Sequence, residues 1–211
     1  MKLKYEAIIF DLDGVLLDTV EMKTQVFASM FEKYGPEVVQ KINEYNKKYG
    51  GKSRSEKFRH YYTHILHKTL TNDILDGLCL EYSARTLKPS IDASCITGAC
   101  AFLERQYKEN NFYVVSAVEQ KDLNLIIKKR KMSKYFKGIF GSPINKVTNI
   151  INIISANYYN SSKVLYIGDL LSDWETSKVV GADFVGVAKT PTFPSNVKVI
   201  KDFINGVPDA I

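Results

Sequence analysis

"IIFDLDGVLLDT", residues 8–19, ends an apolar run with two aspartates, Asp11 and Asp13, and a glycine, Gly14, follows at once. Carboxylates this close repel each other, and aspartate is a poor strand residue. A solvated turn would tolerate both side chains, whereas a site that binds something positively charged would make use of both. The remainder of the sequence has to decide between these two interpretations.

The composition is that of an ordinary folded protein with a moderate excess of basic residues. Of 211 residues, 45% are hydrophobic and 25% are charged, which suits one α/β core with a smaller insertion. The formal net charge of +6 is spread over several lysine-rich stretches, and no recognised nucleic-acid motif accompanies it. We therefore expect a small anionic substrate and no nucleic-acid partner. No window is long and apolar enough to span a membrane.

The cysteines and the N-terminal segment bear on the cellular location. Cys79, Cys95 and Cys100 form neither a paired framework nor a metal-ligand spacing, so they predict reduced thiols in a reducing compartment. Asp11 interrupts the first apolar run too early for a signal peptide. Together these features predict a cytoplasmic protein and leave its oligomeric state open.

Short apolar runs bounded by turn residues recur along the chain and predict strands. They lie at residues 7–10, 112–117, 138–141, 164–169 and 183–187, and segments long enough for helices lie at 119–132, 145–158 and 172–181. Strands that are apolar on both faces and alternate with helices are typical of a parallel sheet covered on both sides. The predicted fold class is therefore α/β, with a doubly wound, Rossmann-like parallel sheet.

Residues 19–88 differ, because they contain no convincing strand. Met22, Val26, Met30 and Tyr34 recur every four residues and predict an amphipathic helix. Turn signals at 34–36 and 49–51 divide this segment, and the "LKP" at 87–89 is expected to end it. We predict a core formed by residues 1–18 and 89–211, and a small α-helical domain of residues 19–88 inserted after the first strand.

Polar side chains follow several predicted strands where the strands end. Besides Asp11 and Asp13, these are Ser116, Lys146, Asp169 and Asp173. Each has a common structural explanation, such as a helix cap or a solvated first turn. In a parallel α/β sheet, however, the carboxyl ends of the strands meet at one edge, where sites form. The conjunction of four acids, a hydroxyl group and a lysine at that edge favours a functional site.

These residues form a chemically coherent set. Mg²⁺ prefers carboxylates, waters and a phosphate oxygen, so Asp11 and Asp169 are candidate ligands, with Asp173 as a ligand or an orienting group. A carboxylate can attack phosphorus and form an aspartyl-phosphate, while a second carboxyl serves as acid and base. Lys146 and Ser116 would hold the phosphate.

The same stretches resemble a known family. "DLDGVLLDT", the serine of "FYVVSA", "GSPINK" and "GDLLSD" resemble, in order, the four motifs of haloacid-dehalogenase-type phosphohydrolases, over nearly the whole chain. The resemblance implies that Asp11 is the nucleophile and Asp13 the general acid/base. It also implies that Ser116 and Lys146 bind phosphate. It makes Asp169 a Mg²⁺ ligand together with the backbone carbonyl of Asp13, and gives Asp173 a supporting role at the metal.

The helical insertion resembles the cap of the phosphoglycolate-phosphatase and β-phosphoglucomutase branch of this family. Such a cap closes over the substrate and excludes water. The stretch "YGGKSRSEKFRHYY", residues 49–62, is in most of its length explained as a loop and a basic amphipathic helix. Because the family's cap loop with a similar glycine-and-arginine pattern reaches the active site, Arg54 is the first candidate for substrate specificity and Lys52 the second.

Several activities share this scaffold, because a fold does not fix a function. Asp13 argues against haloalkanoate dehalogenation, and phosphonate cleavage calls for an imine-forming cap lysine and a different residue in place of Asp13. A sugar-phosphate mutase would keep every motif. A catalytically silent binding module would be free to lose an acid or Lys146. We predict a Mg²⁺-dependent phosphomonoester hydrolase for a small phosphorylated metabolite, with the mutase as the main alternative.

Overall fold

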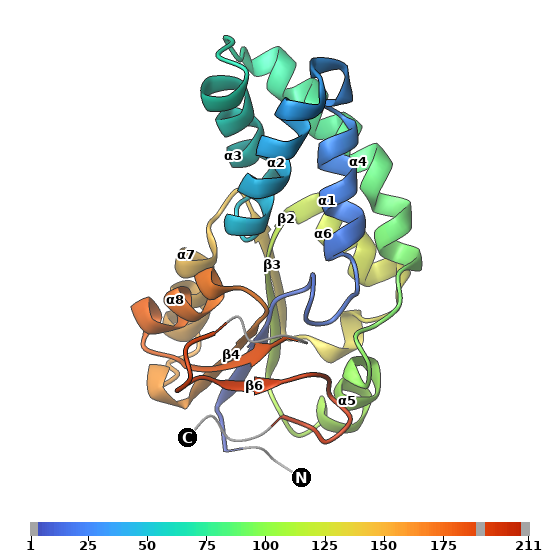
Figure 1. Cartoon of the computed structure of the whole chain (residues 1–211). Coiled ribbons are helices and arrows are strands. Elements are labelled where there is room, and N and C mark those ends of the chain that lie inside the picture. The colour runs from blue at the N-terminus through green and yellow to red at the C-terminus, as the bar shows by residue number, and fades with distance from the viewer. Residues whose placement is uncertain (1–3, 189–192, 208–211) are drawn as a thin grey trace.

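A parallel sheet forms the centre of the molecule, and a group of helices lies above the ends of its strands (Figure 1). The structure is a computed structural model and describes residues 4–188 and 193–207. In these ranges the strands are β1 (Ala7–Phe10), β2 (Phe112–Glu119), β3 (Gly138–Ser142), β4 (Val164–Gly168), β5 (Asp183–Val187) and β6 (Lys198–Ile200). Their order is β3-β2-β1-β4-β5-β6, and all pairs are parallel. The predicted doubly wound sheet is confirmed.

Helices cover both faces of the sheet, which explains why the strands are apolar throughout. The core helices are α5 (Ala99–Gln106), α6 (Gln120–Lys129), α7 (Lys146–Ala156) and α8 (Leu171–Val180). Along β1, Ile8 and Phe10 join the buried cluster that includes Phe102 of α5 and the apolar side chains of α6. Ile9 faces the other way, toward Ile150 of α7. The alternation of side chains along a strand thus supplies both layers of the core.

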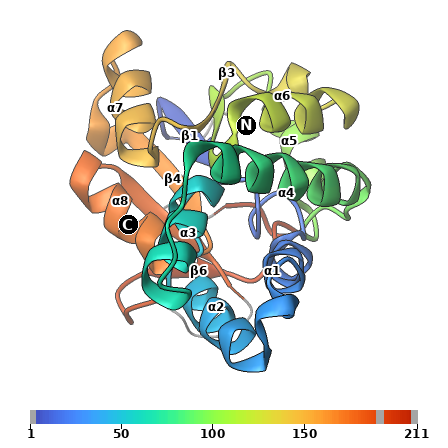
Figure 2. The same cartoon turned by 90° about the horizontal axis from the view of Figure 1, so that it is seen from above.

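The inserted segment forms its own helical layer, which we call the cap. Its helices are α1 (Val20–Ser29), α2 (Pro36–Lys48), α3 (Arg54–His60) and α4 (Asn72–Asp92). A separate aromatic cluster holds them together, with Phe27, Phe31, Phe58, Tyr61 and Tyr82 as members. Seen from above, the cap helices lie over the sheet, with α6 beside α4 (Figure 2).

One helix end is predicted wrongly, and one strand was not predicted. Helix α4 does not end at residues 87–89 but continues through Pro89 to Asp92. Leu87 and Ile91, on either side of this proline, pack against the core cluster, and this burial outweighs the lost backbone hydrogen bond. Strand β6 had no counterpart among the predicted runs. The exact division at residue 88 stays a prediction, and residues 1–3, 189–192 and 208–211 of the expected core lie outside the described ranges.

The chain leaves and re-enters the core along two adjacent segments. The Asp18 amide donates to the Ser94 carbonyl oxygen at 3.0 Å, and the Ile96 amide donates to the Leu16 carbonyl oxygen at 3.0 Å. Beside this crossing, Cys95 and Cys100 are joined in a disulfide, so the expectation of reduced thiols is wrong for this pair. Gly98, with φ of +77°, turns the chain between them and brings their Cα atoms to 6.2 Å. Cys79 is free.

Candidate active site

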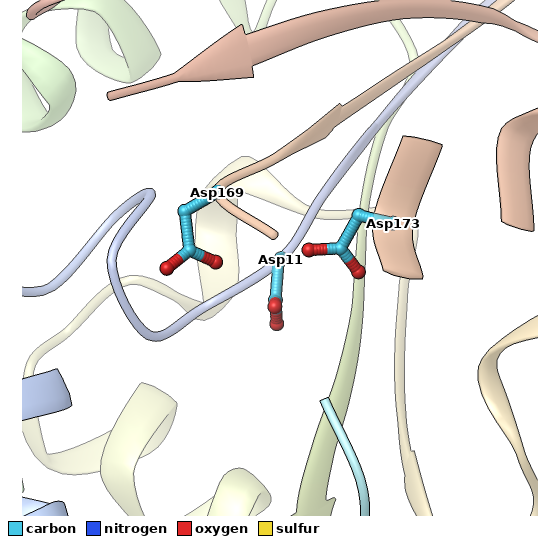
Figure 3. Close-up of side chains that lie close together, drawn as sticks. All are labelled: Asp11, Asp169 and Asp173. Carbon is cyan, nitrogen blue, oxygen red and sulfur yellow. The ribbon is translucent and has the colours of Figure 1, made fainter. Parts of the chain in front are cut away.

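The predicted site residues meet where the strand order changes direction. Asp11 follows β1, Asp169 follows the neighbouring strand β4, and Asp173 lies in the first turn of α8. Parallel sheets bind ligands at this point of their topology. Figure 3 shows Asp169 and Asp173 on either side of Asp11. One carboxylate oxygen of each lies within 4.8 Å of the others, so the three aspartates can share one cation.

Asp11 is buried, and hydrogen bonds fix both of its carboxylate oxygens. Oδ1 accepts from the Leu12 amide at 2.6 Å, and Oδ2 accepts from Lys146 Nζ at 2.6 Å. Burial raises the pKa of Asp11 to about 6, because desolvation outweighs the attraction of Lys146. The side chain is thereby held in one orientation at the end of its strand.

Lys146 is the first residue of α7, where Asn145 caps the helix by accepting from the Thr148 amide at 2.9 Å. Its ammonium group also donates to Asp173 Oδ1 at 2.7 Å. Burial alone would lower the pKa of Lys146, but Asp11 and Asp173 hold this pKa well above its usual value. A buried lysine between two carboxylates is a permanent positive charge at the site.

Asp173 is fixed more completely than the other acids. It is fully buried, accepts from Tyr166 Oη at 2.7 Å and from the Leu170 amide at 3.2 Å, and pairs with Lys146. A Cβ atom at Gly168 would lie 2.3 Å from Asp173 Cβ, so only glycine allows α8 to begin this close to β4. Asp173 therefore orients Lys146, and unlike Asp11 and Asp169 it does not line the cavity described below.

Asp169 carries an unsatisfied oxygen. Its Oδ1 is buried and has no hydrogen-bond partner among the described residues. A Cβ atom at Gly14, where φ is +75°, would lie 2.3 Å from Asp169 Oδ2, so the glycine after Asp13 makes room for this carboxylate. Burial and the nearby Asp11 and Asp173 raise the pKa of Asp169 well above its usual value. Closely spaced, mutually repelling carboxylates with an unsatisfied buried oxygen fit a divalent cation bound by oxygen ligands.

Asp13 faces the cap rather than the carboxylate cluster. Both of its oxygens lie 2.7 Å from Lys23 Nζ of α1, and Thr19 Oγ1 donates to the Asp13 carboxylate. The ion pair of Asp13 with Lys23 was not predicted from the sequence, because a lysine in the first turn of a helix is usually solvated.

Ser116, the predicted phosphate-binding hydroxyl, is buried near the end of β2 and accepts from the Val118 amide at 3.2 Å.

A cavity of about 560 Å³ lies between the core and the cap. From the core side it is lined by the predicted catalytic, phosphate-binding and metal-binding residues apart from Asp173, namely Asp11, Asp13, Ser116, Lys146 and Asp169. From the cap side it is lined by basic residues, among them Lys23, Lys52, Arg54 and Lys57. The structure thus brings both groups of candidates to one cavity.

The two predicted specificity residues have different surroundings. Arg54 is buried, and its Nη1 donates to Ser83 Oγ at 2.6 Å and to Asp122 Oδ2 at 2.7 Å. Its Nε lies 3.4 Å from Glu119 Oε1. Asp122 belongs to α6 of the core, so Arg54 ties the cap to the core. Lys52 is half exposed and pairs with Glu56 at 3.0 Å.

Lys57 is a buried basic residue that the sequence analysis did not single out. Its side chain donates to the Gly50 carbonyl oxygen at 2.9 Å and lies 4.9 Å from the centre of the Phe27 ring. Burial lowers the pKa of Lys57 to about 8. The sequence did contain a signal that Lys57 is buried. Residues 54, 57, 58 and 61 have the spacing of one helix face, and in the structure Arg54, Lys57, Phe58 and Tyr61 are all buried.

The cap loop rests directly on the core. A Cβ atom at Gly50 would lie 2.9 Å from Leu170 Cδ1, and one at Gly51 would lie 2.8 Å from Ser172 Oγ. Leu170 and Ser172 belong to the segment that follows Asp169. The structure therefore represents an arrangement in which the cap is closed over the strand ends.

The sequence profile of the haloacid dehalogenase-like hydrolases matches residues 8–187. The chain belongs to this family. Its membership confirms the predicted hydrolase class, and the motif residues lie within the matched range.

Solved structures agree on the fold. A β-phosphoglucomutase from Clostridium difficile has a TM-score of 0.77 at 19% identity, covering 94% of this chain and 91% of that chain. A predicted phosphoglycolate phosphatase from Haemophilus somnus has a TM-score of 0.72 at 16% identity, covering 96% of both chains. The hydrolase YfnB from Bacillus subtilis, solved with bound magnesium, has a TM-score of 0.71 at 16% identity and covers 96% of this chain and 97% of that chain. No curated protein shows significant sequence similarity to the chain.

Proposed function

We propose that this hydrolase is a Mg²⁺-dependent phosphomonoesterase that acts on a small phosphorylated metabolite through an aspartyl-phosphate on Asp11. The observation that carries the proposal is the buried arrangement of Asp11 between Lys146 and the unsatisfied carboxylate of Asp169. It provides an oriented nucleophile, a fixed positive charge, and oxygen ligands for a cation.

The residues divide the reaction into two displacements at phosphorus. A carboxylate oxygen of Asp11 attacks, the bond from phosphorus to the ester oxygen breaks, and Asp13 protonates the departing alkoxide. Water then attacks the aspartyl-phosphate, Asp13 takes its proton, and phosphate leaves as the Asp11 carboxylate is restored. Ser116 and Lys146 bind phosphoryl oxygens throughout.

The acids also fit the metal that the family resemblance implies. Asp11, Asp169 and the backbone carbonyl of Asp13 would hold Mg²⁺, and Asp173 would support the site from its bonds to Lys146 and Tyr166. When bound, the ion would neutralise charge on the phosphoryl group. The unsatisfied Asp169 oxygen supports this assignment.

Arg54 and Lys52 remain our candidates for specificity, since both line the cavity. Because Arg54 is engaged by Asp122 and Glu119, we expect part of its effect to come through cap closure. Arg54→Ala should reduce kcat/KM for the physiological ester more than for a small generic ester. Equal losses would remove Arg54 from specificity.

A sugar-phosphate mutase is the second candidate, because it would use the same residues and a closed cap that retains its intermediate. Phosphonate cleavage is not favoured: Lys57 is a buried cap lysine, but Asp13 remains in place. We also propose a cytoplasmic location, and the Cys95–Cys100 disulfide is the observation that argues against it, because disulfides are rare in that compartment. As a separate finding, no described helix is long and apolar enough to cross a bilayer.

Phosphate release from a panel of phosphomonoesters tests the proposal. The panel contains sugar 1- and 6-phosphates, nucleotides and small phosphocarboxylates, each assayed with Mg²⁺, with chelator, and with Asp11→Asn. Metal-dependent release that the variant lacks supports the phosphatase. Interconversion of a hexose 1-phosphate and 6-phosphate without net release supports the mutase. If neither occurs with any ester, a binding module without catalysis becomes the better hypothesis.

A further inference from the structure

We propose that Cys95 and Cys100 are a redox modification site that controls how freely the cap opens. The disulfide anchors the segment by which the cap re-enters the core, and reduction by a small dithiol releases that segment. Neither cysteine is among the described residues that line the catalytic cavity. The inference therefore concerns a second site and goes beyond the proposed function.

The disulfide lies where the chain crosses between the core and the cap. Residues 16–18 lead from the core toward α1, and residues 94–96 return from α4. Leu17 and Cys95 pair across this crossing as an antiparallel bridge, next to the two backbone hydrogen bonds that join the segments. Opening the cap has to bend or shift these two segments. Cys95 therefore stands at the hinge itself.

Cys100, in contrast, belongs to a helix that is fixed in the core. It is the second residue of α5, and Ala99, Phe102 and Leu103 of the same helix are buried in the core cluster. The disulfide thus ties the returning segment to the core by a covalent bond. Once the bond is reduced, only hydrogen bonds and packing hold the segment there.

The guanidinium group of Arg130 lies against Cys95. Its Nη2 donates to Cys95 Sγ at 3.4 Å, and its Nη1 donates to the carbonyl oxygens of Ile91 at 2.5 Å and Ala93 at 2.7 Å. The two carbonyl bonds keep the guanidinium group in place on the returning segment. A positive charge beside a sulfur stabilises its thiolate, which is the form that leaves and attacks in disulfide exchange.

This position of Arg130 gives the exchange an order. A thiolate of the dithiol attacks Cys100 Sγ, the bond between the cysteines breaks, and its electron pair goes to Cys95, where Arg130 stabilises the thiolate. The second thiolate of the dithiol attacks its own sulfur in the mixed disulfide and releases Cys100. The dithiol becomes a disulfide, the cysteines gain two electrons, and the two protons of the dithiol pass to the cysteines or to water.

Oxidation uses a small disulfide such as glutathione disulfide. The Cys95 thiolate attacks it and releases one glutathione thiolate, and Cys100 then attacks Cys95 Sγ and releases the second. Both side chains are half-buried, so a small disulfide can reach them. Cytoplasmic thiols would keep the pair reduced, and oxidising conditions would form the bond. The site thereby reconciles a disulfide with the proposed cytoplasmic location.

The disulfide form should be the slower enzyme. In this structure the cap loop rests on Leu170 and Ser172, so substrate entry and product release need an opening motion. An anchored hinge opposes that motion. We expect kcat for the best ester to be at least about threefold lower in the disulfide form than in the reduced form. Cys100→Ser should have the same kcat with and without reductant.

Hydrogen exchange measured by mass spectrometry tests the hinge without a substrate. The protein is treated with glutathione disulfide or with dithiothreitol, and peptides that cover residues 16–18 and 94–96 are compared. Their protected amides should exchange at least about tenfold faster after reduction, whereas those of β4 should not change. Cys100→Ser should exchange like the reduced protein under both conditions. Cys79→Ser, which removes the free cysteine, should behave like the wild type.

The rate of reduction tests the role of Arg130. Alkylation of the released thiols, followed by mass spectrometry, measures this rate with dithiothreitol. Arg130→Met should slow reduction by about three- to tenfold, and Arg130→Lys should restore part of the rate, because it keeps the charge. Arg105→Met removes a charge from the exposed face of α5 and should leave the rate unchanged.

Three results would overturn the proposal: no link between Cys95 and Cys100 after treatment with glutathione disulfide, equal exchange of the hinge amides in both forms, or equal kcat in both forms. Equal reduction rates in Arg130→Met and Arg105→Met would overturn the assigned order of exchange. The wild-type chain supplies both redox forms, so the test stands even if a cysteine variant does not fold. A chain that releases no phosphate from any ester would refute the proposed function alone, because hydrogen exchange still tests the hinge.

Discussion

The two sides of the cavity are built on different principles. On the core side, charged groups stand at or just after strand ends, and Lys146 pairs with Asp11 and Asp173 while Asp169 has no ion-pair partner among the described residues. On the cap side, Lys23, Arg54 and Lys57 come from helices and Lys52 from the loop before α3, and no ion pair of Lys57 is found among the described residues. The core side thus holds more carboxylates than cations, with an unsatisfied oxygen on Asp169, whereas the cap side holds a buried lysine, Lys57, for which no ion pair is found among the described residues.

The largest effect should come from removing Asp11, the proposed nucleophile, on the core side. Asp11→Asn should reduce turnover by at least about 10³-fold. The same variant should be more stable than the wild type in metal-free buffer at pH 8. The pKa of Asp11 rises from the usual 3.8 to about 6 on folding, so the folded state binds this proton more tightly.

The stabilisation by protonated Asp11 is therefore fully present below about pH 4 and is lost as the pH rises through about 6, an effect of up to about 3 kcal/mol. Asparagine stays neutral, so the variant does not lose this stability as the pH rises. Urea unfolding of both proteins between pH 4 and pH 8 measures the difference in their free energies of unfolding. A wild type whose metal-free stability increases over this range relative to the variant would contradict the assignment.

The residues of the core side could be predicted from the sequence, because each one stands at or near the end of a short apolar run. Asp11 and Asp169 stand immediately after apolar runs, and parallel strands bring their carboxyl ends together whatever else the chain does. Even the adjacency of Gly14 and Asp169 follows from β1 and β4 being neighbours. The motifs did not reveal that Asp169 Oδ1 has no hydrogen-bond partner among the described residues. This depends on the exact positions of neighbouring donors, which only the folded structure gives.

The cap side could be predicted only in part. Arg54 does line the cavity, but its partner Asp122 is 68 residues away, and no local pattern links them. Lys57 resembles an ordinary surface lysine until α3 is placed against α1 and α4. The same holds for Pro89, where packing overrides the usual helix stop. Contacts between the cap and the core depend on tertiary geometry, which periodicity does not encode.

Removing the positive charge of the core side should be the next largest effect. Lys146→Met leaves Asp11 and Asp173 buried without a cation and should lower the free energy of unfolding by about 3–5 kcal/mol at pH 8. Saturating Mg²⁺ should restore part of the lost stability, because the ion supplies the missing positive charge. Urea unfolding with and without Mg²⁺ measures the loss and its recovery. Lys137→Met on the exposed surface is the control. A loss no larger than that of the control would show that the acids need no counter-charge.

A smaller effect is expected for the metal itself. Asp169→Asn should weaken Mg²⁺ binding at least about tenfold, whereas the exposed Asp18→Asn should not. Since the pKa of Asp169 is raised in the metal-free protein, Mg²⁺ binding should release protons and strengthen as the pH rises. Calorimetry in two buffers of different ionisation enthalpy measures the affinity and the proton release together. Unchanged affinity in Asp169→Asn would place the metal elsewhere.

The smallest effect tests how the two sides meet. In Gly50→Ala the new Cβ atom would lie 2.9 Å from Leu170 Cδ1, so the cap must open slightly or the leucine must shift. Because the end of a leucine side chain is adaptable, we expect kcat/KM to fall only about three- to tenfold. Gly77→Ala in α4 meets no atom within 4 Å and should leave kcat/KM unchanged. Leu170→Ala should restore activity to Gly50→Ala if contact with this side chain is the cause. If the double variant Gly50→Ala/Leu170→Ala is as slow as Gly50→Ala alone, the loss of activity comes from the backbone of the cap loop. Cap closure would then not depend on the contact between residue 50 and Leu170.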